Sequence, residues 1–196
     1  MSKTITALKS ITKRGGIASG YSFRGKINSS PKGNLRVIQL KDMENEYTSI
    51  GNDCAFINAV GMKEKYYLEK GDILLISKGG NNYAVVFDLE DALPSVASSV
   101  FYVIKVDASK ADPYFVAWYI NKTPVQQYFQ EHAAGTYSLS IKKEVVENIP
   151  LQLPPLAMQK KIAKVAQLAQ KEQYIYNTLK EKRAQLLEVQ LLQSFN

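Results

Sequence analysis

Two adjacent prolines, Pro154 and Pro155, divide the chain, because no glycine or proline follows them. Proline breaks the interior of a helix but suits its first position, so this pair predicts a long helix that begins at Leu156. A helix of about 38 residues is roughly 57 Å long, which is too long for one small domain to cover. We therefore expect a globular domain over residues 1–153 and a long helix over residues 154–196.

The expected helix carries a heptad pattern, which is typical of a coiled-coil seam. Its seam positions are Ile162, Val165, Ala169, Glu172, Tyr176, Leu179, Arg183 and Leu186. In an antiparallel pair with its two-fold axis midway between Tyr176 and Leu179, Glu172 faces Arg183 of the other copy. A parallel pair in register would stack like charges instead. The pattern predicts an antiparallel homodimer; a solvated helix, or one packed on its own domain, is the alternative.

The charge of the chain is positive and unevenly distributed. The formal net charge is +7, and residues 1–36 hold eight basic side chains and no acidic one. Such a surface suits phosphate groups, although a basic protein without a nucleic-acid partner is equally compatible with the charge alone. No apolar run of membrane-spanning length is present, and the N-terminal residues lack the continuous apolar core of a signal peptide, so we expect neither a membrane span nor a secretory leader. The single cysteine, Cys54, favours the cytoplasm.

The hydrophobic pattern of the first 153 residues predicts an α+β fold with antiparallel strands. Strands are expected over residues 35–43, 72–77, 83–87 and 97–106, separated by turns rich in Gly, Asn and Asp. One helix is expected over residues 114–132 after Asp112-Pro113. A helical turn within residues 141–149 and a strand at 150–154 complete this domain.

No sequence motif indicates catalysis. Asp112-Pro113-Tyr114-Phe115 is similar to the catalytic signature of amino-group DNA methyltransferases, but one proline and the glycine-rich methyl-donor loop are missing. Lys78-Gly79-Gly80 lacks the spacing of a P-loop. With one cysteine and one histidine, His132, the chain offers no zinc site, and we expect neither metal nor cofactor. A small methyltransferase or nuclease, or a coiled-coil adaptor without DNA binding, stays an alternative function.

Polar and basic residues in three Gly-containing loops are the candidates for DNA contacts, because Lys and Arg neutralise phosphates while Asn, Arg and Ser reach base edges. The candidates are Ser22, Arg24 and Lys26 in the first loop, Lys78, Asn81 and Asn82 in the second, and Thr136, Tyr137, Ser138 and Lys142 in the third.

Several segments together resemble the target recognition domain of type I restriction-modification specificity subunits. They are IASGYSFRGKI, RVIQLKDM, LEKGDILLISKGG and GTYSLSIKKEVVENIPLQLPPLAMQKKI, in the family's order and spacing. The resemblance implies a non-catalytic subunit that reads one half of a bipartite double-stranded DNA target. It also implies that the helix acts as a spacer and docks the modification (methyltransferase) subunits, which the restriction subunits join later. The usual subunit holds two recognition domains and two helices, so this chain resembles a half-subunit.

Overall fold

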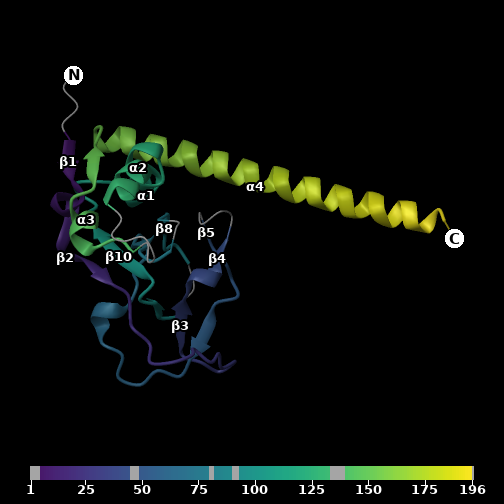
Figure 1. Cartoon of the computed structure of the whole chain (residues 1–196), viewed down its shortest axis with the longest axis horizontal. Helices are drawn as coiled ribbons and strands as arrows, with labels where there is room; N and C mark the ends of the chain where they lie inside the picture. Colours follow the sequence, from purple (N-terminus) through teal and green to yellow (C-terminus); the bar gives the residue numbers. More distant parts are fainter. Residues whose placement is uncertain (1–4, 45–48, 80–81, 90–92, 133–139, 196) are drawn as a thin grey trace.

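The computed structural model of the chain describes residues 5–44, 49–79, 82–89, 93–132 and 140–195. Its strands are β1 (Ile5–Ala7), β2 (Thr12–Ser19), β3 (Leu35–Ile38), β4 (Met43–Glu44), β5 (Ser49–Ile50), β6 (Ala55–Ile57), β7 (Ile73–Ile76), β8 (Ala84–Val86), β9 (Ser95–Ala97), β10 (Phe101–Val106) and β11 (Pro150–Gln152). Its helices are α1 (Pro113–Ile120), α2 (Thr123–His132), α3 (Lys143–Glu147) and α4 (Leu156–Gln193), with short 3-10 turns η1 (Leu8–Ile11), η2 (Leu40–Asp42) and η3 (Glu64–Tyr66). Figure 1 shows α4 extending from a body of sheets and short helices.

The largest sheet joins four antiparallel strands in the order β2-β10-β7-β8. Side chains alternate between the two faces of a strand, so Ile73 and Leu75 of β7 enter one hydrophobic core while Leu74 and Ile76 enter a second. Both faces are therefore covered, which explains why β7 is apolar throughout. The structure confirms the buried strand expected over residues 72–77 and the strand expected over residues 83–87.

A smaller sheet has the order β6-β3-β9, in which β3 runs antiparallel to β6 and parallel to β9. The prediction of one strand over residues 97–106 was wrong. β9 pairs with β3 and β10 pairs with β2 and β7, and a turn closed by the Phe101 N–H and the Ser98 carbonyl (3.1 Å) separates them. The strand expected over residues 35–43 ends at Ile38, because the Gln39 N–H donates to Asp42 Oδ2 (2.7 Å) and starts η2.

The helix expected over residues 114–132 is two helices. Pro124 has no N–H for the Ile120 carbonyl, so α1 ends there and Gln126 Nε2 donates to that carbonyl instead (2.9 Å). The Asn121 side chain leaves the helix and bonds the backbone of Ala84 as a neighbouring strand would, accepting from its N–H (2.7 Å) and donating to its carbonyl (2.8 Å). The break between α1 and α2 thus lets the Asn121 side chain satisfy the backbone of Ala84 at the outer edge of β8.

The main core lies between the four-stranded sheet and the helices α1, α2 and α3. Leu8, Ile104, Phe115 and Phe129 are almost completely buried in it. The short pair β1-β11 brings the start of the domain next to the strand that precedes α4. β1 is therefore hydrogen-bonded to the strand at the base of the long helix.

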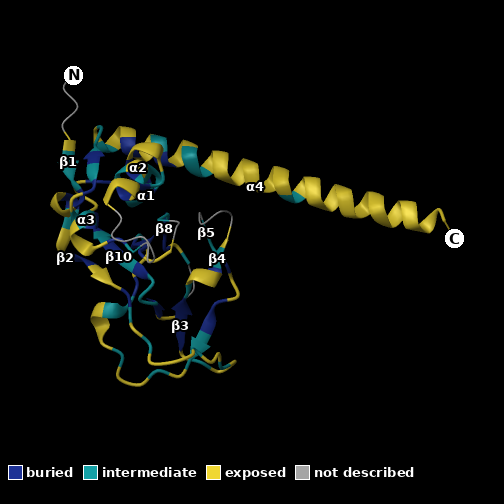
Figure 2. Ribbon diagram, in the orientation of Figure 1, coloured by how far each residue is buried: buried dark blue, intermediate teal, exposed yellow. Residues whose placement is uncertain are grey.

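α4 has 38 residues and begins directly after Pro155, as the sequence predicts. Its first turns pack on the domain, where Gln159 is buried and accepts a hydrogen bond at Oε1 from the Asp112 N–H (3.0 Å). Every residue from Leu168 to Phe195 except Thr178 is exposed, as Figure 2 shows. The expected α+β domain with a long C-terminal helix is confirmed, while the domain boundary at Pro154 stays a prediction. None of the helices in the described ranges is long and apolar enough to cross a membrane.

Candidate nucleic-acid interface

The first two candidate DNA-binding loops leave the four-stranded sheet at one end, and the described end of the third, residues 140–142, lies beside the second. Ser19 pairs with Tyr102 and Ile76 pairs with Phe101, so β2 and β7 end where β10 begins. We call this place the loop end of the sheet and define it by residues 20–26, 77–79, 98–100 and 140–142. The sequence alone did not indicate that these segments are neighbours.

Backbone hydrogen bonds connect the segments of the loop end. The Tyr21 N–H donates to the Ala97 carbonyl (2.7 Å), and Tyr21 forms a bridge with Ser98. The Ser77 N–H donates to the Val100 carbonyl (2.8 Å), and the Ile141 N–H donates to the Ser77 carbonyl (3.0 Å). Lys78 also forms an antiparallel bridge with Ser140. The loop end is therefore one continuous hydrogen-bonded surface.

The predicted DNA-contact residues differ in how exposed their side chains are. Ser22, Arg24, Lys26, Lys78 and Lys142 are exposed at the loop end. Asn82 is half-buried, and its Nδ2 donates to the Ile76 carbonyl (2.9 Å), so its side chain supports the second loop from within. The remaining candidates, Asn81, Thr136, Tyr137 and Ser138, lie outside the described residues.

Within the described residues, no acidic side chain neutralises the basic side chains of the loop end. Arg24, Lys26, Lys78 and Lys142 form no ion pair with the residues that the structure describes. At the opposite end of the sheet, Lys105 lies 2.7 Å from Asp72 Oδ2 and 3.4 Å from Glu69 Oε1. Two carboxylates thus neutralise Lys105 at this end of the sheet, which we call the neutralised end.

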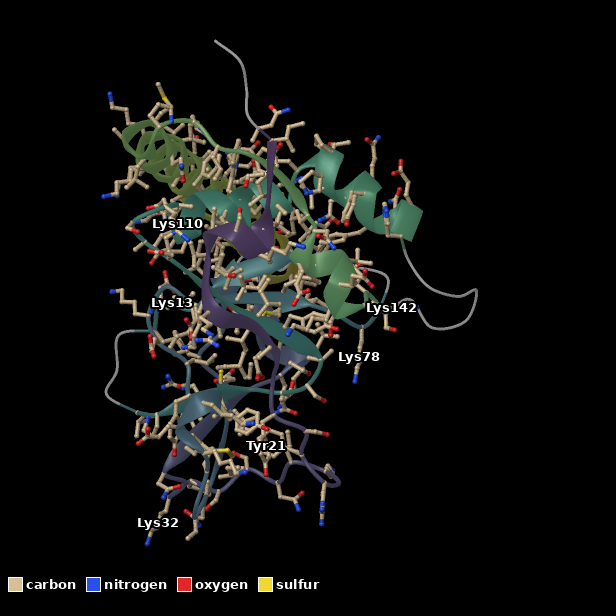
Figure 3. The ribbon with its side chains drawn as sticks, turned by 90° about the vertical axis from the view of Figure 1, so that its left-hand side faces the viewer. Lys13, Tyr21, Lys32, Lys78, Lys110 and Lys142 are labelled. Atoms are coloured by element: carbon tan, nitrogen blue, oxygen red, sulfur yellow. The ribbon has the colours of Figure 1, made fainter. Side chains whose placement is uncertain are left out.

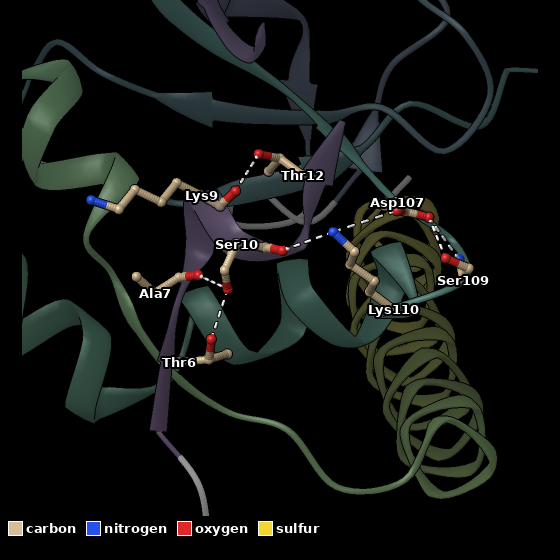
Figure 4. A network of polar contacts seen from close by, with 8 residues as sticks. All are labelled: Thr6, Ala7, Lys9, Ser10, Thr12, Asp107, Ser109 and Lys110. Atoms are coloured by element: carbon tan, nitrogen blue, oxygen red, sulfur yellow. Dashed lines mark hydrogen bonds and ion pairs between the residues drawn. The ribbon is translucent and has the colours of Figure 1, made fainter. Parts of the chain in front are cut away.

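Two further lysines at the neutralised end are paired as well. Lys13 lies 3.6 Å from Glu69 Oε2. Lys110 lies 3.7 Å from Asp107 Oδ2 and donates to the Ser10 carbonyl (3.1 Å), within the network drawn in Figure 4. Figure 3 shows Lys78 and Lys142 on the opposite side of the domain from Lys13 and Lys110. Lys13, Lys105 and Lys110 are thus each paired with a carboxylate on the side of the domain away from the loop end.

The pKa values of the two acids at the neutralised end, Asp72 and Glu69, shift in opposite directions. Burial raises the pKa of Asp72 above its usual value, although the Glu69 N–H and the Lys105 ammonium both donate to its carboxylate. The charge of Lys105 lowers the pKa of the exposed Glu69. Lys105 is therefore held between two carboxylates and is not available to a ligand.

An aromatic cluster adjoins the loop end, and the sequence reasoning did not identify it. The rings of Tyr21 and Phe23 meet edge to face with centroids 4.7 Å apart, and those of Tyr21 and Tyr66 do so at 5.0 Å. The Lys65 ammonium lies 4.9 Å from the centroid of the Tyr66 ring. The alternation of aromatic and basic residues from Tyr21 to Lys26 is the sequence signal that could have indicated half of this cluster.

The residues considered for catalysis have structural roles. Asp112 Oδ1 accepts from the Phe115 N–H (2.9 Å) and caps α1, which is the helix-start role that its sequence context favours. Cys54 is buried, and this burial raises the pKa of its thiol to about 11. Across the described ranges, no group of three or more His, Cys, Asp or Glu side chains could hold a metal ion.

The seam residues of α4 lie on a face that the domain leaves uncovered. Ile162 is half-buried at the edge of the domain, whereas Val165, Tyr176, Leu179 and Leu186 are each between 58% and 66% exposed. The remaining seam positions, Ala169, Glu172 and Arg183, are exposed too. Because Gln159 and Ala163 form the face toward the domain, the seam is free to meet another helix.

The sequence profile of the type I restriction modification DNA specificity domain matches residues 8–187 of the chain. The chain belongs to this family. The family resemblance expected from the sequence is thereby confirmed. No curated protein matches the chain in sequence.

Solved structures from type I restriction-modification systems share the fold of this specificity domain. One, described under the assembly and conformational transition of the type I R-M system, is 15% identical, with a TM-score of 0.66 over 89% of this chain and 44% of its own. The HsdS subunit from Thermoanaerobacter tengcongensis is 14% identical, with a TM-score of 0.60 over the same shares. The S subunit from M. genitalium is 16% identical, with a TM-score of 0.56 over 84% of this chain and 38% of its own. The specificity domain thus spans less than half of each of these chains.

Proposed function

We propose that this specificity domain reads one half of a bipartite double-stranded DNA target and adds no chemistry of its own. The observation that carries the proposal is a group of basic side chains at the loop end, Arg24, Lys26, Lys78 and Lys142, that form no ion pair with the described residues. At the other end, Lys13, Lys105 and Lys110 are each paired with a carboxylate. Lys and Arg at such a surface neutralise phosphates and fix the register of the protein on the duplex. As a DNA-bound subunit it would act in the cytoplasm.

The loop end offers different contacts for affinity and for specificity. Lys78 and Lys142 are long, exposed point charges that suit phosphates. Ser22 and Arg24 have donors that suit base edges in a groove, and Gly25 between Arg24 and Lys26 has a φ of 83°, which lets the loop turn sharply. Asn81, Thr136, Tyr137 and Ser138 complete the proposed set of contacts.

A binding experiment tests this function. The full chain is used to select duplexes from a random library, and the selected duplex is then competed against unselected duplexes of the same length. Specific sites typically bind about a thousandfold or more tighter than non-specific DNA. Equal affinity for selected and random duplexes would contradict sequence recognition and favour the alternative of an adaptor or a merely basic protein.

The uncovered seam of α4 supports the proposal that two copies associate as an antiparallel homodimer. With the two-fold axis midway between Tyr176 and Leu179, the charged seam positions Glu172 and Arg183 pair twice per dimer. The two recognition domains then lie at opposite ends of the rod. Two-fold protein symmetry leads us to expect two inverted half-sites separated by a fixed gap. We also propose that the rod docks modification subunits, which carry the methyl-donor chemistry, and that restriction subunits join through them.

Charge reversal tests the register of this dimer. Glu172→Arg removes two opposite-charge pairs and creates two like-charge pairs. At about 0.5 kcal/mol for each loss and each repulsion, the sum is about 2 kcal/mol, or roughly 30-fold in the dimer dissociation constant. Arg183→Glu should act equally, and the double variant should restore the parent affinity. Sedimentation equilibrium measures all three, with Glu181→Arg, an exposed site outside the seam, as the matched control. A double variant as weak as the single ones would refute the register, and a monomeric parent would refute the dimer.

A further inference from the structure

A hollow of about 470 Å³ lies beside the loop end and is lined by the aromatic cluster and a neighbouring loop. Its lining includes Tyr21, Phe23 and Tyr66 on one side and the loop of residues 57–63 on the other. This volume is within the range of small-ligand sites. The hollow is directly continuous with the proposed DNA interface, because Tyr21 and Phe23 flank Ser22 in the first loop.

The walls of the hollow are held in place by the fold. The Asn34 side chain holds the 57–63 loop by two hydrogen bonds to Ala59. Its Oδ1 accepts from the Ala59 N–H (2.9 Å), and its Nδ2 donates to the Ala59 carbonyl (3.3 Å). Phe23, Ile57 and Tyr66 pack against the small core formed by Leu35, Val37 and Val96. The hollow is therefore formed before any ligand arrives.

Val60 projects from the rim of the hollow without any cover. It is 100% exposed, and the neighbouring Gly61 turns the chain there with a φ of 73°. Lys63 lines the same hollow, and Lys65 lies over the Tyr66 ring. An exposed apolar side chain in basic surroundings is the arrangement with which DNA-binding proteins separate stacked base pairs.

We propose that Val60 enters the duplex as a wedge and that the hollow receives one unstacked DNA base. The aromatic side chains of Tyr21 and Tyr66 offer the base a stacking surface, which accepts any base because every base has a π-face. Lys63 and Lys65 are placed to neutralise the phosphates on either side of the displaced nucleotide. The inference deepens the proposed function and rests on it, since it requires the chain to bind DNA.

Mismatch scanning of the selected duplex tests the inference. Each base pair in turn is broken by replacing the base on one strand, and the affinity of the full chain is measured. Mismatches at positions that are read weaken binding, whereas a mismatch at the extruded position lowers the cost of unstacking. We expect about tenfold tighter binding at one position per half-site. No position with tighter binding would overturn the inference.

Two variants and a control connect that effect to the hollow. In Val60→Ser and in Tyr66→Leu the ratio of mismatched to matched affinity should fall toward one, while Tyr66→Phe keeps the parent ratio. Val60→Ser changes a fully exposed side chain, so this variant should fold like the parent. It therefore tests the inference even if Tyr66→Leu is too unstable to measure. Tyr174→Leu is the control for the change of side chain, because Tyr174 lies on α4 and does not line the hollow.

The outcomes separate the two proposals. A chain that selects no duplex contradicts both the proposed function and the wedge. A chain that selects a duplex but shows no tightening, or whose Val60→Ser variant keeps the tightening, contradicts the wedge alone.

Discussion

Gly20 is where the first loop of the interface is fixed to the sheet, and Gly20→Ala tests that attachment. A Cβ at this position would lie 2.3 Å from the Ser98 carbonyl oxygen and 2.6 Å from that of Ala97. Both contacts are with backbone, so no side chain can move aside. The added methyl group must therefore push the start of the loop away from the 98–100 turn.

The cost follows from what that separation breaks. The Gly20 N–H bond to the Phe101 carbonyl (2.9 Å) and the Tyr21 N–H bond to the Ala97 carbonyl (2.7 Å) are both at the contact. Losing most of two hydrogen bonds costs about 1–3 kcal/mol, and overpacking costs about 1–3 kcal/mol more. The lower entropy of the unfolded Ala chain returns about 0.5–1 kcal/mol. We expect the free energy of unfolding to fall by about 1–5 kcal/mol, with a midpoint of about 3 kcal/mol.

Urea denaturation at a fixed protomer concentration measures this change. Gly25→Ala is the matched control, because nothing lies within 4 Å of its Cβ position and its φ of 83° is the only source of cost. That variant should lose about 1 kcal/mol. A Gly20→Ala variant as stable as the parent, or no less stable than Gly25→Ala, would refute the close approach of the loop to the turn.

Two further predictions concern the edge of the sheet and the absence of chemistry. Asn121→Ala leaves the buried N–H and carbonyl of Ala84 without partners and should lower the free energy of unfolding by about 2–4 kcal/mol in the same denaturation assay; a loss below about 0.5 kcal/mol would contradict the role of Asn121 as an edge cap. The purified chain should neither methylate nor cut DNA, and methylation of adenine within a defined site should require a modification subunit, as radiolabelled methyl transfer would show. Activity of the chain alone that Asp112→Ala abolishes would instead support the methyltransferase or nuclease alternative.

The start of the long helix and the burial of the central strand could be predicted from the local sequence alone. Pro155 marks the start of α4 because proline is restricted in the same way in every protein, and the apolar run of β7 indicates burial on both faces. The break between β9 and β10 could not be predicted in this way. The turn at Ser98 contains neither Gly nor Pro, and only its pairing with two different sheets separates the strands.

The sequence indicated the exposed basic residues of the first loop, but it did not indicate the other parts of the candidate site completely. Arg24 and Lys26 stand in an acid-free segment and form no ion pair with the described part of the chain, whereas Lys13 in the same segment pairs with Glu69. The sequence alone does not show which of these basic side chains is paired, because only the fold brings Glu69 to Lys13. Tyr66 was missed for the same reason, since only the fold brings it to Tyr21.

The salt dependence of DNA affinity tests the central claim, that the loop end of the sheet is the DNA-binding surface. The logarithm of the association constant is measured against the logarithm of salt concentration for the parent, Lys78→Ala, Lys142→Ala and the control Lys110→Ala at the neutralised end. Each phosphate contact contributes about 0.9 to the slope. Lys78→Ala and Lys142→Ala should each reduce its magnitude by about one unit per half-site, or about two for the homodimer, while Lys110→Ala leaves it unchanged. Unchanged slopes for Lys78→Ala and Lys142→Ala, or an equal reduction for Lys110→Ala, would show that DNA binds elsewhere.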